Sequence, residues 1–432
     1  MSLYRIPLLL LLILWLPGIA QAVLEIRITE GREGAMPIAI APFGLTAGAP
    51  PPGEDLAEII STNLYRSGQF SPLARNAMPQ RPTQAQDIQF GVFRDRGMEY
   101  LVIGRIQQSG AERYQVEFEL FDTLTEKSLA GYAIPSTRAE LRRTAHKISD
   151  LIFERITGKR GAFDTQIAYV SATRSTTQRQ FTLQIADADG HNPRTIFRST
   201  EPLMSPAWSP DGQRLAYVSF ENRRSEVYIQ TISSGTRTLV ASHPGINGAP
   251  AWSPDGRRLA LALSKDGEPN IYVLDLASRQ LRQLTQTRSI DTEPVWAPDG
   301  RSIIFTSDRA GNPQLYEVGI DGGQPRRLTF EGRYSGAADI APDGRTLAFV
   351  YGDDGRFRIA ALNRATQAAR MLTQGRMDES PSFAPNGSMI IYATSEQGRG
   401  VLAAVSEDGR VHQRLLSQEG EVREPAWSPF LR

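Results

Sequence analysis

Histidines and closely spaced acids are the residues of this chain whose types could bind a metal or move a proton. The four histidines are His146, His191, His243 and His412, and their positions show no metal-ligand spacing. The stretch 187–190, Asp-Ala-Asp-Gly, has the start of a calcium loop but lacks the later ligands of that motif. We therefore expect no metal site, with the histidines structural or on the surface and the acidic stretch in a turn.

Nucleophilic chemistry also lacks its usual residues. The chain has no cysteine, so neither disulfides nor a thiol nucleophile are available. It has no Gly-x-Ser-x-Gly elbow and no glycine-rich loop that could cradle a phosphate. These absences favour a non-enzymatic role.

Four further aspartates recur at regular intervals, but each belongs to a repeated turn. The repeat reads Pro-Ala-Trp-Ser-Pro-Asp-Gly at 206–212, and its copies begin at residues 206, 250, 294, 338, 381 and 425, in steps of 44, 44, 44, 43 and 44. Proline, aspartate and glycine in this order suit a tight turn. The aspartates of the motif are therefore expected to be turn residues: Asp211, Asp255, Asp299 and Asp343.

The period of the repeat predicts a β-propeller, because repeats of this length with strand-forming runs are typical of propeller blades. Each unit has a short strand that carries the tryptophan, followed by three more runs of strand-forming residues. We expect the recurring tryptophans to pack between blades. They are Trp208, Trp252, Trp296 and Trp427.

The two ends of the repeat region predict that the propeller closes on itself. Runs of the type that follows the turn begin near residues 166, 214, 258, 302, 346 and 388, which makes six. The first run has no motif ahead of it, and the last motif, at 425–429, has no run behind it. We therefore expect six blades over residues 163–432, with the C-terminal segment supplying the inner strand of the first blade. Closure of this kind protects strand edges.

The preceding part of the chain predicts a signal peptide and a mixed α/β domain. Residues 1–22 contain Arg5, an apolar run and Ala-Gln-Ala, which indicates export with cleavage between Ala22 and Val23. Residues 23–162 then alternate predicted strands and helices, including a long helix expected to begin at a capping box of Thr137 and Glu140. Residues 23–34 form an N-terminal arm, because Leu24, Ile26 and Ile28 alternate like a strand before a glycine-rich break.

The charge of the exported chain argues against nucleic acid as a partner. The full chain has 48 basic and 47 acidic residues, and only Arg5 of these lies in the first 22, which leaves 47 of each. A nucleic-acid binder would usually show a basic excess or stripe.

Together, the signal peptide, the α/β domain and the six blades resemble the TolB family, periplasmic propeller proteins of the bacterial Tol-Pal system. The loops 247–250 (Asn-Gly-Ala-Pro) and 292–294 (Thr-Glu-Pro) are also similar to the family's blade entries, whereas Ala338, Ile340 and Asn386 depart from its repeat. The resemblance implies a periplasmic scaffold without enzymatic activity or cofactor. Its implied partners are the lipoprotein Pal at the propeller mouth and the C-terminal domain of TolA at the mature N-terminus, in support of outer-membrane integrity and cell division.

The resemblance also implies which residues bind these partners. The Pal-binding mouth would comprise the residues just before each inner strand: Met204, Ser205, Asn247, Gly248, Ala249, Asp291, Thr292, Glu293, Ser335, Gly336, Asp378, Glu379, Arg423 and Glu424. The TolA-binding arm would comprise Val23, Leu24, Glu25, Ile26, Arg27, Ile28 and Thr29. On its pattern alone, the arm fits equally well as an edge strand of the α/β domain.

Two functions of other classes stay open at this point. One is a periplasmic receptor for a sugar or a peptidoglycan fragment. The other is a propeller hydrolase that uses acids in its channel, although the missing nucleophile elbow argues against it.

Overall fold

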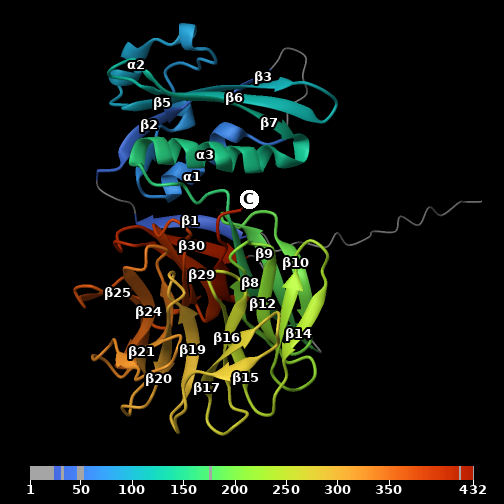
Figure 1. Cartoon of the computed structure of the whole chain (residues 1–432). Coiled ribbons are helices and arrows are strands. Elements are labelled where there is room, and N and C mark those ends of the chain that lie inside the picture. The colour runs from blue at the N-terminus through green and yellow to red at the C-terminus, as the bar shows by residue number, and fades with distance from the viewer. Residues whose placement is uncertain (1–23, 31–33, 46–52, 175–177, 418–419, 432) are drawn as a thin grey trace, which may run out of the picture.

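The computed structural model describes residues 24–30, 34–45, 53–174, 178–417 and 420–431 of the chain (Figure 1). These residues form an α/β domain stacked on one end of a β-propeller (Figure 1). The expected cleavage site after Ala22, with Val23, lies outside the described residues. Among the residues described, no helix is long and apolar enough to span a membrane.

The α/β domain is built on a six-stranded sheet in the order β4-β2-β5-β6-β7, with β3 paired to β5. Its strands are β2 (Met36–Ile40), β3 (Gly44–Leu45), β4 (Phe70–Pro72), β5 (Tyr100–Gln108), β6 (Arg113–Asp122) and β7 (Ser128–Thr137). Its α-helices are α1 (Leu56–Arg66), α2 (Phe90–Arg94) and α3 (Leu141–Thr157). The apolar faces of α1 and α3 share one core with the sheet, and the residues around α2 pack on the other face.

The ends of the two longer helices follow from their sequences, with one correction. The Asp55 carboxylate accepts a hydrogen bond from the Glu58 backbone N–H at 3.2 Å and so caps α1. Gly158 ends α3 at a φ of 74°. The predicted capping box was wrong in detail: a 3-10 turn over Arg138–Glu140 precedes α3, and the Thr137 hydroxyl donates to the Glu140 carboxylate instead.

The propeller has six blades of four antiparallel strands, as predicted. The first is formed by β31 (Glu421–Trp427), β8 (Gln166–Arg174), β9 (Arg179–Asp187) and β10 (Arg194–Ser199). The second and third are β11 (Leu203–Trp208), β12 (Arg214–Ser219), β13 (Glu226–Thr231), β14 (Arg237–Ala241), β15 (Asn247–Trp252), β16 (Arg258–Leu263), β17 (Asn270–Asp275) and β18 (Leu281–Gln283). The remaining three are β19 (Asp291–Trp296), β20 (Ser302–Ser307), β21 (Gln314–Gly319), β22 (Arg326–Arg327), β23 (Tyr334–Ile340), β24 (Thr346–Asp353), β25 (Arg356–Asn363), β26 (Ala369–Met371), β27 (Glu379–Phe383), β28 (Met389–Glu396), β29 (Arg399–Ser406) and β30 (His412–Ser417).

The ring closes as the sequence predicted, because the C-terminal strand β31 pairs antiparallel with β8. The recurring tryptophans also lie between blades, and their indoles add a contact that the pattern did not reveal. The Trp208 indole N–H donates to the Ala426 carbonyl of the preceding blade at 3.0 Å. Trp252 repeats this contact with Ala207 at 3.1 Å. Each of these tryptophans therefore contributes both buried apolar surface and a hydrogen bond between blades.

The N-terminal arm is a strand, β1 (Leu24–Glu30), but it does not belong to the sheet of the α/β domain. It pairs antiparallel with β30 and becomes the fifth strand of the last blade, beside the domain junction (Figure 1). The period-two pattern predicted a strand and left its partner open. The outer edge of the last blade offers unpaired backbone groups, and β1 covers them.

The two domains meet at the end of the propeller that carries the repeated turns. The Asn386 amide, in the turn of the last blade, donates to the Arg160 carbonyl at 2.9 Å. The Arg160 guanidinium stacks on the Phe430 ring at 3.8 Å. The inner strands begin at the opposite end of the propeller, so the predicted mouth faces away from the α/β domain.

Candidate functional site

The inner strands of the six blades surround a central channel of about 600 Å³. One residue of each inner strand has a left-handed backbone, with φ between 47° and 53°. These residues are Ser205, Ala249, Glu293, Ala337, Ser380 and Glu424, and all six line the channel. Each lies at a register shift between the inner strand and its neighbour.

This ring is a strained feature. A left-handed conformation in a residue other than glycine costs roughly 1–3 kcal/mol, and such residues gather at functional sites. A β-bulge likewise re-aims a side chain and is common near sites. Because the same bulge recurs in all six blades, we take the channel mouth as a candidate functional surface.

The predicted mouth residues all lie at or just before the starts of inner strands, but they divide into three groups. Ser205, Ala249, Glu293 and Glu424 line the channel. Met204, Gly248, Thr292, Glu379 and Arg423 are exposed or half-buried beside it. Asn247, Asp291, Ser335, Gly336 and Asp378 are buried. The prediction selected neither Ala337 nor Ser380, which are the channel-lining residues of the fifth and sixth blades.

Three of the buried polar residues hold the loops that enter the inner strands. The Asn247 side chain accepts from the His243 backbone N–H at 2.8 Å. The Arg309 guanidinium donates to both carboxylate oxygens of Asp291, at 3.0 and 2.9 Å. The Asp378 carboxylate accepts from the hydroxyls of Thr373 and Thr394, each at 2.5 Å. These side chains position the mouth from beneath and are not available to a partner.

A group of exposed apolar side chains, here called the mouth collar, is a feature that the sequence reasoning largely missed. Each lies at the start of an inner strand or in the loop just before one, and each is between 41% and 68% exposed. The mouth collar consists of Met204, Ile246, Ile290, Phe330 and Met377. Only Met204 was predicted, although an isolated apolar residue directly before a repeated strand is a signal that could have found Ile246 and Ile290.

Two glutamates join neighbouring blades inside the mouth. The Glu293 carboxylate accepts from the Ala337 backbone N–H of the next blade at 2.8 Å. Glu424 makes the equivalent contact to the Ser205 backbone N–H. These glutamates belong to the fourth and first blades, so they lie on opposite sides of the ring. The pKa of Glu424 is raised to about 7, chiefly by burial and further by the carboxylates of Glu379 and Glu293.

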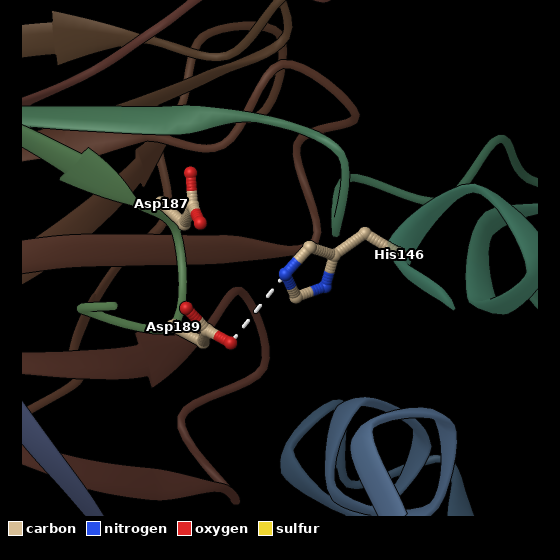
Figure 2. A group of neighbouring side chains, drawn as sticks. All are labelled: His146, Asp187 and Asp189. Atoms are coloured by element: carbon tan, nitrogen blue, oxygen red, sulfur yellow. Dashed lines mark ion pairs between the residues drawn. The ribbon is translucent and has the colours of Figure 1, made fainter. Parts of the chain in front are cut away.

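A second polar cluster, here called the junction cluster, lies between the two domains and comprises His146, Asp187 and Asp189. Figure 2 shows His146 projecting from α3 toward the two acids, which lie at the end of β9 and in the turn that follows it. The His146 Nε2 atom is 3.5 Å from an oxygen of Asp189, and Arg142 forms an ion pair with the same carboxylate. The sequence reasoning treated the histidine and the acids separately, because about 40 residues divide them in the chain.

Burial and charge set the protonation states in the junction cluster. Burial lowers the pKa of His146 to about 3, so its imidazole is neutral. Burial would raise the pKa of Asp189, but the neighbouring His191 side chain and the charges of Arg66 and Arg142 outweigh burial and hold that pKa well below its usual value. Burial also raises the pKa of Asp187.

Two family models match the chain and together cover most of it. The model described as the TolB amino-terminal domain matches residues 24–129. The model described as the TolB beta propeller domain matches residues 153–431.

Relatives with known names match over nearly their full length. A protein of Thioalkalivibrio sulfidiphilus named "Tol-Pal system protein TolB" is 69% identical over 424 residues, which is 98% of each chain. A protein of the same name from Nitrosococcus oceani is 64% identical over 425 residues, 97% of each chain. The crystal structure of TolB from Acinetobacter baumannii is similar with a TM-score of 0.87 and 39% identity, covering 94% of this chain and 100% of that one. These relatives are named for a system of proteins and not for a reaction, in agreement with the expected non-enzymatic role. The chain belongs to the TolB family.

Proposed function

We propose that this protein is a periplasmic scaffold of the Tol-Pal system that binds Pal through its propeller mouth and the C-terminal domain of TolA through its N-terminal arm. In this role it supports outer-membrane integrity and the constriction of the outer membrane at division. Membership of the family and the names of the relatives support a Tol-Pal role. The two partners are assigned from the resemblance together with the surfaces described below.

The mouth collar is the observation that carries the Pal assignment. Its five apolar side chains are exposed at or just before the starts of the inner strands. A protein partner seated at this end of the propeller could bury them. The six channel-lining residues form a polar centre inside this collar, with carboxylates at Glu293 and Glu424. A protein partner that covers the collar and places polar or basic groups over the opening would meet these carboxylates.

The position of β1 supports the TolA assignment. A strand that only completes the edge of a blade has backbone groups that can pair equally well with the sheet edge of another protein. Residues 31–33 connect β1 to the α/β domain. Glu30, just before them, belongs to the last blade, and Gly34, just after them, leads into β2 of the α/β sheet. Release of β1 therefore needs no rearrangement of the α/β core.

The chain path also connects the two proposed binding sites. Leu24 of β1 pairs with Ser417 of β30. Only residues 418–420 separate β30 from β31, whose Glu424 lines the mouth. We expect a partner seated at the mouth to alter how firmly β30 holds β1, so the two sites are coupled.

A pair of charge substitutions tests the mouth. The variant I246D/I290D places two carboxylates in the mouth collar, and we expect it to lose Pal binding because apolar anchors are replaced by charges that the complex would desolvate. Both side chains are half exposed, so the melting temperature is expected to stay near that of the parent. Binding is measured by calorimetry with purified Pal.

The matched control for this test is L239D, which changes an equally exposed residue on the outer strand β14. If I246D/I290D binds Pal as tightly as L239D does, the Pal site does not lie at the mouth collar.

Removal of residues 23–32 tests the arm. The shortened protein should fold, bind Pal with altered affinity and lose the C-terminal domain of TolA. Thermal melting and separate titrations with each partner measure these outcomes. TolA binding at full strength without the arm would mean that the arm is structural only.

A further inference from the structure

The junction cluster brings ligand-type side chains from both domains to one place. His146, Asp187 and Asp189 each present one ligand atom, and these atoms lie within 4.8 Å of one another (Figure 2). A fourth ligand-type residue, His191, has its Nδ1 atom 3.5 Å from the other oxygen of Asp189. Three ligand-type side chains thus converge where α3 meets the first blade, and His191 lies beside one of them, Asp189.

One of these ligand atoms has no hydrogen-bond partner among the described residues. His146 is only 2% exposed, and its Nε2 atom, which faces Asp189, is unpaired because 3.5 Å is longer than a normal hydrogen bond. A buried polar atom without a partner is costly and calls for a reason. The other ring nitrogen, Nδ1, is in contact with the Asn63 amide at 2.9 Å.

Asn63 can orient the imidazole as a metal ligand. Its amide nitrogen contacts His146 and Ser149, while its oxygen Oδ1 is unpaired. Rotation of the amide by half a turn gives up the hydrogen bond from its nitrogen to Ser149 and places the oxygen against Nδ1 of His146, which then carries the proton. The lone pair on Nε2 then points at the two acids, and a histidine held in this way by a second hydrogen bond is the usual form of a metal ligand.

Two guanidiniums lie beside the two acids of the junction cluster, and each keeps another partner if a metal binds. Arg66 is buried, and its guanidinium donates to the Ala188 carbonyl at 2.8 Å. Arg142 pairs with Asp189 but also reaches Glu54 at 3.4 Å, so it keeps a partner if a metal takes its place. Within the described part of the chain, the Asp187 carboxylate accepts a side-chain hydrogen bond only from the neutral Asn192 amide, at 2.7 Å. From this geometry we propose that His146, Asp187 and Asp189, with His191 as a fourth ligand, form a zinc site that joins the two domains.

The ligand set selects the metal. Zinc binds four ligands drawn from imidazole nitrogens, thiolates and carboxylates, whereas calcium takes six to eight oxygens. The proposed site offers two nitrogens and two carboxylates, so zinc is the better fit. The expectation of no metal site rested on the spacing of ligand-type residues along the chain. That spacing does not show that His146 on α3 packs against the turn after β9. The proposal is independent of the Pal and TolA assignments.

Zinc titration of the full-length mature protein, without an affinity tag and stripped of metals, tests the site. We expect one equivalent of zinc to bind and to raise the melting temperature, because the ion holds the two domains together. Cobalt in place of zinc should give the absorption bands of a tetrahedral site. The variants H146Q and D187N should each weaken binding by more than about tenfold, whereas H243Q, on the mouth side of the propeller, should not.

The variant R142Q distinguishes a metal site from a purely structural cluster. It removes the cation that competes for Asp189, so zinc should bind more tightly even if the protein without metal is less stable. Absence of zinc binding at micromolar protein would overturn the proposal. Equal zinc affinity in H146Q, D187N and the parent would overturn it as well. Asp187 is a partly exposed residue at the end of β9, so D187N keeps the test valid if H146Q alone fails to fold.

Discussion

Individual residues of the propeller show how an altered repeat is compensated. The fifth blade has Asp339 where three of the other blades have alanine, and the sixth has Phe383 where four of the other blades have tryptophan. Phenylalanine has no indole N–H to donate to the preceding blade. Instead, the Asp339 carboxylate accepts from the Phe383 backbone N–H at 2.7 Å. The later blade still donates and the preceding blade still accepts, but the donor is now a backbone N–H and the acceptor a side-chain carboxylate.

This substitution should make stability depend on pH. Burial raises the pKa of Asp339 to about 6, whereas the pKa of an aspartate in an unfolded chain is about 3.9. Between these values the native state keeps a proton that the unfolded chain has released, so its stability falls as the pH rises from about 4 through about 6. The variant D339N has no carboxyl group to titrate at this position, and its amide oxygen can still accept a hydrogen bond from the Phe383 backbone N–H.

We therefore expect D339N to gain stability relative to the parent as the pH rises from about 4 to about 7. Urea unfolding at several pH values gives the difference in the free energy of unfolding between D339N and the parent. The contributions of the other titrating groups are the same in both proteins and drop out of this difference. The turn variant D299N is the matched control for the loss of one aspartate. A stability difference between D339N and the parent that does not change with pH would contradict the assignment.

At the scale of elements, the blade is the unit that the sequence specifies best. The turn motif, the strand runs and their spacing all lie within 44 residues, so local pattern was enough to place six blades, their inner strands and the closing strand. The same holds for the helices of the α/β domain, apart from the start of α3. What local pattern could not supply was contact between distant segments. The partner of β1 and the meeting of His146 with Asp189 both depend on how the domains pack.

The closing strand β31 gives the element-scale prediction. Deleting residues 426–432 removes Trp427 and the Ser428 contacts to Gln166 at the start of the first blade. Loss of a fully buried tryptophan costs about 3–5 kcal/mol, and Trp427 is partly buried. The start of β8 also loses its pairing with residues 426 and 427. We expect a strongly lowered melting temperature, measured by calorimetry.

The control for this truncation removes only residues 431 and 432 and so keeps the stacking of Arg160 on Phe430. Equal melting temperatures for the long and short truncations would show that closure adds little to stability.

For the molecule as a whole, the blade that closes the ring and the blade that holds the arm are neighbours. β31 belongs to the first blade and β30, with β1 on its edge, to the last. The mouth and the arm therefore share the seam at which the propeller closes. A binding event on either side of this seam has a short physical route to the other, and the effect must be reciprocal because coupling is a property of the equilibrium.

A reversible covalent lock measures this coupling. The chain has no cysteine, and Leu24 is paired with Ser417 across β1 and β30, so the variant L24C/S417C can form a single disulfide that keeps the arm docked. We expect the oxidised protein to lose TolA binding and to regain it when reduced. Pal affinity should also differ between the two redox states, within the roughly 5–150-fold range of allosteric coupling. Equal Pal affinity in both states would mean that mouth and arm act independently, and TolA binding by the locked protein would mean that TolA recognises a different surface.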